Sequence, residues 1–439
     1  MIKKYYIYTY GCQMNVHESE KIAGLLCGIG YTATSEPNDA DLIVFNTCCI
    51  RDTAEKKILG NIGDVKKFKK EKKDLIVAVV GCMTQQEGAA ERLRKHFPFV
   101  NIVLGTSNLQ ELPYLVQQIE EGNKRYGISV LMNENPEIVE DIPVFRTSGT
   151  NAWVNIMYGC NNFCTYCIVP YVRGRERSRS PEMILREVKT LLEEGYKEIT
   201  LLGQNVDSYS YDDKDFAYLL DKVAEFDGKY RIRFMTSHPK DFNSRVIDVV
   251  KNHQNICNSI HLPIQSGSNR ILKLMNRHYT RERYLEIIDE IRNKIPNVGI
   301  TSDIMVGFPT ETEEDFDDTV SLVKEVGYSG AFTFVYSPRN GTVAAKMEQL
   351  PYSVKKDRIT KLVALQNQIN VEKSQEYIGK TEEILVEDGN LKKRGQVCGR
   401  TDNGRLVTFD GDSSMVGQFI NVKITASKSS ALHGERQDG

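Results

Sequence analysis

Three cysteines close together near residue 160 constrain this chain more than any other feature of its sequence. Cys160, Cys164 and Cys167 follow a β-rich run with the spacing C-x3-C-x2-C. Thiolates at this spacing in one loop suit three corners of a four-iron iron–sulfur cube. Because three ligands leave one iron open, the pattern is typical of a catalytic rather than a structural metal site. A zinc knuckle completed by a distant fourth ligand is the alternative, although zinc pairs usually read C-x2-C twice.

The composition is that of a globular protein with enough apolar residues for a core. The chain has 439 residues, of which 40% are hydrophobic and 26% charged, and this length suggests about two to four domains. A formal net charge of −2 indicates no overall affinity for nucleic acid, so any basic surface must be local. We find no signal-peptide pattern and no membrane-spanning stretch, and therefore expect a cytoplasmic protein. In that compartment cysteines are metal ligands or buried thiols rather than disulfides.

Each of three apolar runs in the N-terminal third ends at a cysteine. The runs and their cysteines are Tyr5–Gly11 with Cys12, Leu42–Thr47 with Cys48 and Leu75–Gly81 with Cys82. Helical patterns separate the runs, which predicts an open parallel α/β sheet covered on both faces. Because the carboxyl ends of parallel strands lie at one edge of a sheet, we expect the three cysteines to converge and bind a second 4Fe–4S cluster.

Two other interpretations of these cysteines stay open. A single cysteine after a strand is usually a packing residue, because cysteine is among the most buried residue types. Three in the same topological position make coincidence a weak explanation. Cys49 adjoins Cys48 and could be the ligand in its place, since the spacing prefers neither. We choose Cys48 because it follows the strand directly.

The loop around Cys160 resembles the signature of the radical S-adenosylmethionine enzymes, in which an aromatic residue, here Tyr166, stands between the last two cysteines. Strand-like and helix-like runs alternate from this region up to about residue 336. The expected strands are Trp153–Tyr158, Glu198–Leu202, Ile232–Met235, Ser259–Leu262, Gly299–Met305 and Ala331–Val335. Six strands are too few for a closed eight-stranded barrel, so we expect an open (β/α)6 partial TIM barrel, which is also the fold that the resemblance implies.

Polar or glycine-bearing segments follow these strands, at the end where barrel enzymes place their sites. Such a ring could hold the amino acid, ribose and adenine groups of S-adenosylmethionine. Gln204, Ser237 and Gln265 are the candidates for hydrogen bonds, and the backbone near Val306 is the candidate partner of the adenine. Any one of these could instead be an ordinary turn residue.

Two basic segments are candidates for contact with RNA. Arg173, Arg175 and Arg177 follow the cysteine loop, and guanidinium groups suit phosphate contacts, although a solvated loop paired with nearby acids is an equally good interpretation. From about Glu376, short strands and turn signals predict a small β-barrel, a fold that often binds nucleic acid. Its basic cluster is Lys392, Lys393 and Arg394. A purely stabilising module is the alternative.

With both cysteine sets in place, the chain resembles the methylthiotransferases of the radical S-adenosylmethionine superfamily over nearly its whole length. Seven stretches match the branch that modifies isopentenyladenosine in tRNA: Tyr10–Asn15, Phe45–Cys48, Gly81–Met83, Arg173–Arg177, Leu202–Asn205, Thr236–Pro239 and Lys273–Arg277. The comparison also favours Cys48 over Cys49. One departure is Thr310, where the family commonly has glycine; this could alter a turn but touches no cluster ligand.

The resemblance implies four segments and a reaction. The segments are an N-terminal methylthiotransferase domain over residues 1–118, a linker over 119–146, a radical core over 147–375 and a TRAM domain over 376–439. The reaction adds a methylthio group to C2 of N6-isopentenyladenosine at position 37 of tRNA. One S-adenosylmethionine would methylate a sulfur at the N-terminal cluster, and a second would be cleaved at the other cluster to the radical that abstracts the C2 hydrogen.

The resemblance also implies partners and a substrate preference. We expect two 4Fe–4S clusters, a tRNA anticodon stem-loop, an electron donor such as flavodoxin or ferredoxin, and a monomeric enzyme. Gln13 and Asn15 should border the N-terminal cluster, where relatives with carboxylate-bearing acceptors typically have a lysine just after the cysteine. The alternatives are a methylthiotransferase for threonylcarbamoyl-adenosine in tRNA or for a ribosomal-protein aspartate, and a non-catalytic iron–sulfur RNA-binding protein.

Overall fold

The chain separates into two units. The computed structural model describes residues 2–49, 52–130, 136–146, 149–387, 395–428 and 431–437, with side chains in helix α2 from residue 55 onward. The first unit holds residues 1–147, 158–163 and 167–177, and the second holds residues 148–157, 164–166 and 178–439.

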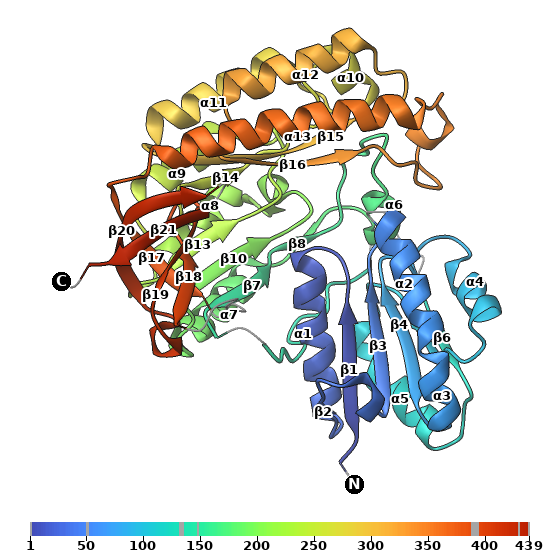
Figure 1. Ribbon diagram of the computed structural model, residues 1–439. Coiled ribbons are helices and arrows are strands. Elements are labelled where there is room, and N and C mark those ends of the chain that lie inside the picture. Colours follow the sequence, from blue (N-terminus) through green and yellow to red (C-terminus); the bar gives the residue numbers. More distant parts are fainter. Residues whose placement is uncertain are drawn as a thin grey trace. The chain divides into compact units, whose positions relative to one another are not determined.

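A six-stranded parallel sheet forms the first unit (Figure 1). Its strands in spatial order are β2 (Thr32–Ala33), β1 (Lys4–Thr9), β3 (Leu42–Thr47), β4 (Ile76–Gly81), β5 (Ile102–Leu104) and β6 (Gly127–Ser129). Its helices are α1 (Gln13–Gly28), α2 (Asp52–Asp64), α3 (Lys66–Glu71), α4 (Ala89–His96), α5 (Leu112–Glu120) and α6 (Val169–Arg173), with 3-10 turns at Pro37–Asp39 and Leu109–Glu111. The expected open parallel sheet is confirmed, and β6 lies inside the range 119–146 for which a linker was expected.

Helices cover both faces of this sheet, which explains its continuous apolar strands. Every residue of β3 and of β4 is buried. On one face Ile22 of α1 and Leu112 of α5 pack against the sheet, and on the other face Ile58 of α2 and Leu93 of α4 do so. A strand buried on both sides needs apolar residues at every position rather than at alternate ones.

The second unit contains a (β/α)6 partial barrel, as expected. Its parallel strands are β7 (Asn151–Asn155), β10 (Glu198–Leu202), β13 (Arg231–Phe234), β14 (Ser259–His261), β15 (Gly299–Val306) and β16 (Gly330–Val335). Its helices are α7 (Pro181–Glu193), α8 (Phe216–Ala224), α9 (Ser244–Asn252), α10 (Asn269–Leu274), α11 (Arg281–Lys294), α12 (Glu313–Val326) and α13 (Tyr352–Gln375). Short elements are the pairs β8 (Met157–Tyr158) with β9 (Arg177–Ser178) and β11 (Ser210–Tyr211) with β12 (Lys214–Asp215), and the 3-10 turns Val206–Ser208 and Ala344–Lys346.

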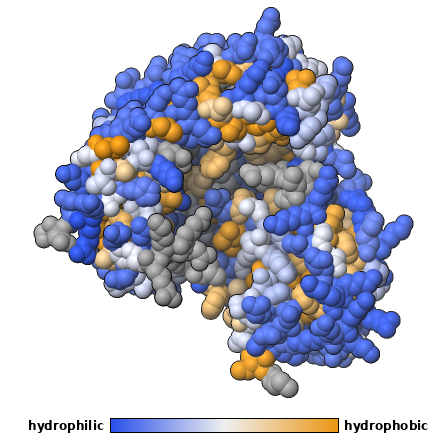
Figure 2. Space-filling model, in the orientation of Figure 1, coloured by the Kyte–Doolittle hydropathy of each residue, from blue (hydrophilic) through white to orange (hydrophobic). Residues whose placement is uncertain are grey.

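The barrel helices follow local signals in the sequence. Helix α7 begins at Pro181 after an N-cap serine, Ser180, whose hydroxyl accepts the backbone N–H of Met183. Helix α12 begins with a capping box formed by Thr312 and Asp315. The apolar faces of these helices pack on the strands, so the helical layer α11–α13 presents mainly hydrophilic residues on the side drawn in Figure 2.

A closed five-stranded barrel ends the chain. Its strands in spatial order are β17 (Thr381–Glu387), β18 (Gln396–Arg400), β19 (Leu406–Asp410), β21 (Ala431–Arg436) and β20 (Phe419–Lys428), and a 3-10 turn lies at Ser413–Met415. The expected small β-barrel is confirmed. Lys392, Lys393 and Arg394, the basic cluster singled out in the sequence, lie outside the described residues.

Two arginines of the partial barrel hold this C-terminal module by its backbone. Arg231, the first residue of β13, donates to the carbonyl oxygens of Arg400 (2.7 Å) and Glu383 (2.8 Å). Arg233 donates to the carbonyl oxygens of Thr401 (3.0 Å) and Asp402 (3.1 Å). The module therefore sits at the amino ends of the barrel strands, opposite the ends where a barrel site forms.

Thr310 has the left-handed backbone that glycine would relieve. Its φ is +64° in the loop between β15 and α12, and its carbonyl oxygen accepts Nη2 of Arg270 at 2.7 Å. A β-branched side chain at positive φ is strained by about 1–2 kcal/mol. Replacing it with glycine relieves this strain, but the greater freedom of glycine in the unfolded chain offsets roughly half of the gain in stability.

We therefore expect Thr310→Gly to raise the free energy of unfolding by about 0.5–1 kcal/mol. Thermal or urea unfolding followed by circular dichroism measures the change. Thr312→Ala, two residues on, is the matched control: it removes the N-cap of α12 and should lower stability by about 1 kcal/mol. A destabilised Thr310→Gly variant would contradict the argument.

Candidate functional site

The three N-terminal cysteines follow three adjacent strands and meet at one edge of the first sheet. Cys12 is the N-cap of α1 after β1, Cys48 follows β3, and Cys82 follows β4. Gly11 has a φ of +117°, and a Cβ atom there would lie 2.7 Å from Cβ of Cys48. Glycine is thus required for the Cys12 turn to approach Cys48 this closely.

Cys49 and Cys82 form a hydrogen-bonded thiol pair at this edge. Both are buried, and they pack with Ile168 and Val172. A hydrogen bond with Cys49 and the charge of Arg173 lower the pKa of the Cys82 thiol to about 7, against the effect of burial. The same hydrogen bond, together with burial, raises the pKa of Cys49. The Cys49 thiol is thus suited to donate a hydrogen bond to a Cys82 thiolate, and the thiolate is the form that binds iron.

Arg173 is a buried partner of this cysteine group. It is 7% exposed, and its Nη1 and Nη2 atoms donate to the two carboxylate oxygens of Glu18 at 2.6 and 3.2 Å. Its charge also faces Cys82 and Cys12. The phosphate contact of Arg173 stays a prediction, and in this structure the guanidinium has a two-point carboxylate partner in the interior.

The other arginines of this segment differ from Arg173. Arg175 is exposed, and its guanidinium lies 4.4 Å from the ring centre of Phe163. Arg177 is half-buried and donates to the carbonyl oxygens of Arg173 and Pro136. Of the three, Arg175 keeps a position suited to a phosphate group.

The two candidate substrate contacts beside Cys12 differ in their exposure to solvent. Gln13 is exposed, whereas Asn15 is fully buried. The side-chain amide of Asn15 donates to the carbonyl oxygen of Thr47 at 3.0 Å and to Oδ1 of Asn46 at 3.2 Å, while its Oδ1 lies 3.5 Å from Sγ of Cys12. The substrate contact of Asn15 stays a prediction, and in this structure its polar atoms hold the cysteine turn against β3.

The second cysteine loop lies between β8 and α6 and requires unusual backbone conformations. Gly159 has a φ of +78°, and a Cβ atom there would lie 2.0 Å from the carbonyl oxygen of Arg175. Phe163 also has a positive φ, +45°. The hydroxyl of Thr165 donates to the carbonyl oxygen of Leu274 at 2.9 Å, which fixes the loop beside Cys164 to the barrel.

Arg277 is a site residue that the sequence analysis did not single out. It is 4% exposed, and its Nη1 atom lies 3.3 Å from Sγ of Cys164. The match of Lys273–Arg277 to the family was the one available signal, because Arg277 and Cys164 are 113 residues apart in sequence.

Buried polar atoms gather at the carboxyl ends of the barrel strands. Oδ1 of Asn205, Nε2 of His238 and Oε1 of Gln265 lack a hydrogen-bond partner among the described residues. Such groups are costly in a protein interior unless something else pairs with them. A ligand with polar groups, such as an amino acid carrying a nucleoside, supplies those partners, so the chemistry of this ring fits S-adenosylmethionine.

The candidate S-adenosylmethionine contacts differ from one another in burial and hydrogen bonding. The hydroxyl of Ser237 donates to Oδ1 of Asp207 at 3.3 Å, and Gln204 is half-buried. Gln265 has a φ of +69°, a conformation that turns its chain at the end of β14. The side chain of Val306 is buried, and its carbonyl oxygen already accepts the amide of Tyr336 at 2.9 Å. These ligand roles stay predictions.

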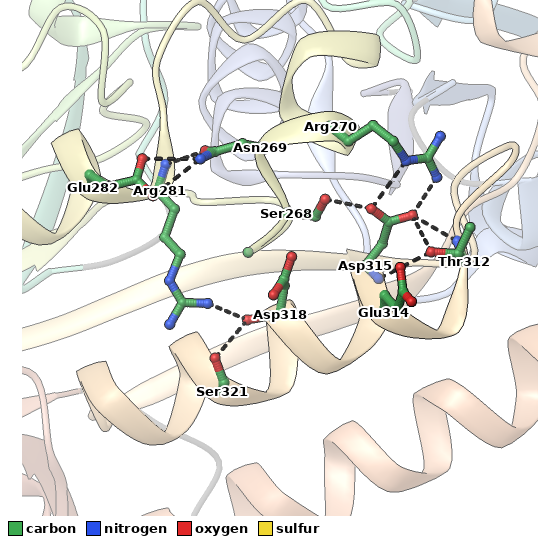
Figure 3. A pocket seen from close by; sticks show the side chains of 11 residues that line it. Ser268, Asn269, Arg270, Arg281, Glu282, Thr312, Glu314, Asp315, Asp318 and Ser321 are labelled. Carbon is green, nitrogen blue, oxygen red and sulfur yellow. Dashed lines mark hydrogen bonds and ion pairs between the residues drawn. The ribbon is translucent and has the colours of Figure 1, made fainter.

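An open depression of about 810 Å³ lies between α10, α11 and α12 (Figure 3). Figure 3 shows Arg270 and Ser268 pointing toward Asp315. The hydroxyl of Ser268 donates to Asp315 at 2.6 Å, and Arg270 forms an ion pair with the same carboxylate. Burial alone would raise the pKa of Asp315, but these hydrogen bonds lower it. These contacts attach the start of α10 to the start of α12.

Sets of three thiolates are suitable ligands for iron–sulfur clusters. Within the described parts of the chain, no three His, Cys, Asp or Glu side chains are grouped as ligands of one ion. In a four-iron cube each thiolate binds a different iron, so the thiols need to surround a volume rather than a point.

Curated proteins with one shared name match this chain along almost its full length. A tRNA-2-methylthio-N(6)-dimethylallyladenosine synthase from Desulforamulus reducens is 52% identical over 436 residues, which cover 99% of this chain and 95% of that protein. Synthases of the same name from Clostridium botulinum (strain Langeland) and Clostridium perfringens (strain 13) are 51% identical over 438 residues, covering 99% of this chain and 97% of each. This chain belongs to the tRNA-2-methylthio-N(6)-dimethylallyladenosine synthase family. The methylthiotransferase resemblance seen in the sequence is confirmed.

Family models and solved structures agree with this membership. The Radical SAM superfamily model matches residues 154–323, the TRAM domain model matches residues 375–436, and the model of the Uncharacterized protein family UPF0004 matches residues 4–105. The radical S-adenosylmethionine methyltransferase TsrM from Kitasatospora setae, solved with cobalamin and a 4Fe–4S cluster, superposes with a TM-score of 0.60 at 12% identity, covering 92% of this chain and 81% of that one. At this identity the likeness shows the fold. Among the described helices, none is both long and apolar enough to cross a membrane.

The buried carboxyl of Asp207 predicts a pH dependence of stability for this synthase. Burial raises the pKa of Asp207 to about 7, although Ser237 and the amide of His238 donate to it. Between about pH 4 and pH 7 the folded protein keeps a proton that the unfolded chain loses, so this group makes stability fall as pH rises.

Between about pH 4 and pH 7 we expect Asp207 to lower the free energy of unfolding by on the order of 4 kcal/mol. Asp207→Asn should remove this part of the pH dependence, and unfolding of both proteins between pH 4.5 and 7.5 measures it. Asp315→Asn is the matched control: the pKa of Asp315 is lowered, so this substitution should cost stability at neutral pH instead. An unchanged pH slope in Asp207→Asn would contradict the assignment.

Gln265 should contribute to S-adenosylmethionine binding through its unpartnered oxygen. Gln265→Leu removes that acceptor. We expect the dissociation constant of S-adenosylmethionine to rise about tenfold, a loss of about 1.4 kcal/mol of binding free energy. Equilibrium binding of S-adenosylmethionine to the reconstituted protein measures it. Gln366→Leu is the control, because Gln366 is a buried glutamine of α13 whose Oε1 also lacks a partner in the described structure. Equal effects of both substitutions would show a general loss of stability rather than a lost contact.

Proposed function

We propose that this chain adds a methylthio group to C2 of N6-isopentenyladenosine at position 37 of tRNA. The observation that carries the proposal is the identity of 51–52% with synthases of that name over nearly their whole length. Two separate sets of three cysteines agree with it, because the reaction needs a sulfur source and a radical source. The enzyme uses two 4Fe–4S clusters and S-adenosylmethionine.

The protein's own contribution is to bind, orient and exclude water. When bound, the two clusters and S-adenosylmethionine supply the sulfur, the methyl group and the radical that an inert aromatic C–H bond requires. We propose Cys12, Cys48 and Cys82 as ligands of one cluster and Cys160, Cys164 and Cys167 as ligands of the other. Gln204, Ser237, Gln265 and the backbone of Val306 are proposed to hold S-adenosylmethionine.

Recognition of tRNA is proposed for exposed groups of both units. Gln13 borders the Cys12 turn, Arg175 is exposed beside the second cysteine loop, and the TRAM domain would grip the RNA, with Lys392, Lys393 and Arg394 as candidates. The target base would be splayed out of its loop to reach the reacting atoms. We keep the segments 1–118, 119–146, 147–375 and 376–439 as the proposed domains, and further propose a cytoplasmic monomer that receives electrons from a flavodoxin or ferredoxin.

Charge at the N-terminal cysteines supports an uncharged acceptor. Arg173, the cation that faces Cys12 and Cys82, is already paired with Glu18. A carboxylate on a threonylcarbamoyl group would enter this region without that cation as a partner, and an unpaired buried charge is costly. An isopentenyl group carries no charge and has no such cost.

The test incubates reduced, reconstituted enzyme and S-adenosylmethionine with two anticodon stem-loop RNAs, one isopentenylated and one threonylcarbamoylated. We expect at least about a tenfold preference for the isopentenyl RNA, measured as methylthio product by mass spectrometry. Gln13→Lys places a cation directly after Cys12 and should reduce that preference. Val16→Lys, a cation at an exposed position further along α1, should leave it unchanged. Preference of the unmodified enzyme for the threonylcarbamoyl RNA would overturn the assignment.

A further inference from the structure

Arg277 is a buried cation, and none of its hydrogen-bond partners among the described residues is a carboxylate. Its guanidinium donates to the hydroxyl of Tyr279 at 3.0 Å, to the carbonyl oxygen of Pro263 at 3.0 Å and to Sγ of Cys164 at 3.3 Å, and lies 3.4 Å from the hydroxyl of Tyr166. A guanidinium stays protonated in proteins, so Arg277 is a buried positive charge.

Other buried arginines show what Arg277 lacks. Arg173 pairs with Glu18 at 2.6 Å, Arg233 with Glu198 at 2.8 Å, and Arg358 with Glu311 at 2.7 Å. Among the described residues, no carboxylate forms an ion pair with Arg277. A buried charge without a counter-charge is costly, so the fold has to gain a compensating anion at this place.

A cluster bound at Cys164 supplies that anion. Three thiolates on a cube of core charge about +2 give a net charge of about −1, and one-electron reduction makes it about −2. A fixed cation within hydrogen-bonding distance of one of the sulfurs favours the more negative form. Net charge and hydrogen bonds to the sulfurs are among the factors that set the reduction potential of such clusters.

We propose that Arg277 is a positioning residue that holds the sulfur of Cys164 and raises the reduction potential of the cluster bound by Cys160, Cys164 and Cys167. The inference rests on the proposed function only in that this cluster is the one that must be reduced. The step transfers one electron from a low-potential donor of the flavodoxin or ferredoxin class to the cluster, and no bond forms or breaks. The buried guanidinium thereby makes the cluster easier for such a donor to reduce.

The surroundings of Arg277 allow the residue to be replaced without leaving carbonyl groups unpaired. The hydroxyl of Tyr279 also donates to the carbonyl oxygens of Ile264, at 2.8 Å, and Pro263, at 3.3 Å. Arg277→Met removes both the charge and the hydrogen bond to sulfur, Arg277→Gln keeps a donor without charge, and Arg277→Lys keeps the charge on a smaller group.

The experiment measures the midpoint potential of this cluster by redox titration followed by electron paramagnetic resonance, without S-adenosylmethionine. Cys12→Ala, Cys48→Ala and Cys82→Ala together isolate the cluster in the full-length chain, which should hold about four irons. In this background we expect a more negative potential for Arg277→Met and Arg277→Gln and a potential near that of the parent for Arg277→Lys. The neutral double substitution Glu18→Gln with Arg173→Met is the matched control and should leave the potential unchanged.

A parent-like potential in either neutral variant with an intact cluster overturns the inference. If Arg277→Met does not retain iron, Arg277→Gln decides the question. A shift in Arg277→Lys as large as in Arg277→Met overturns the role of charge. These outcomes are separate from the proposed function, because a failure to methylthiolate any RNA leaves the measured potentials and their interpretation intact.

Discussion

The parallel alignment of strands is the constraint on which both units depend. In a parallel sheet every strand delivers its carboxyl end to the same edge, so residues from distant parts of the sequence meet there without any specific attraction between them. In the first unit this edge receives Cys12, Cys48 and Cys82. In the second unit it receives the amide oxygens of Asn205 and Gln265, which lack a hydrogen-bond partner among the described residues. Burial of the strands on both faces supplies the stability that keeps these edges in place.

The two cysteine sets are served by buried arginines in different electrostatic states. Arg173 reaches Cys82 with its charge already offset by Glu18, whereas Arg277 reaches Cys164 with neutral neighbours. The Arg173–Glu18 pair holds a loop in place with little net electrostatic field. Arg277 leaves a positive electrostatic field at the sulfur of Cys164. One chain can therefore give two similar clusters different electronic properties through the presence or absence of a single carboxylate.

The sequence predicted the parts of this structure that depend on local pattern. Continuous apolar runs gave the parallel strands, cysteines at their ends gave the edge where thiols meet, and turn signals gave the C-terminal barrel. It could not predict which polar side chains would be buried, because burial depends on partners distant in sequence. The arginine-rich segment predicts an RNA contact for Arg173, because its partner Glu18 is 155 residues away in sequence. The position of Asn15 after Cys12 predicts a substrate contact for a similar reason, since its partners lie on β3.

The attachment of the C-terminal barrel to the amino ends of the strands makes the partial barrel a spacer of fixed length. Arg231 and Arg233 grip backbone carbonyl groups of that module, so its distance from the opposite, reactive end is set by the strands themselves. The longest strand of the partial barrel, β15, has eight residues and therefore spans about 26 Å. An RNA that touches both ends has to bridge a length of this order. The enzyme would then select its RNA by length as well as by base identity. A hairpin too short to bridge the gap would contact only one of the two surfaces.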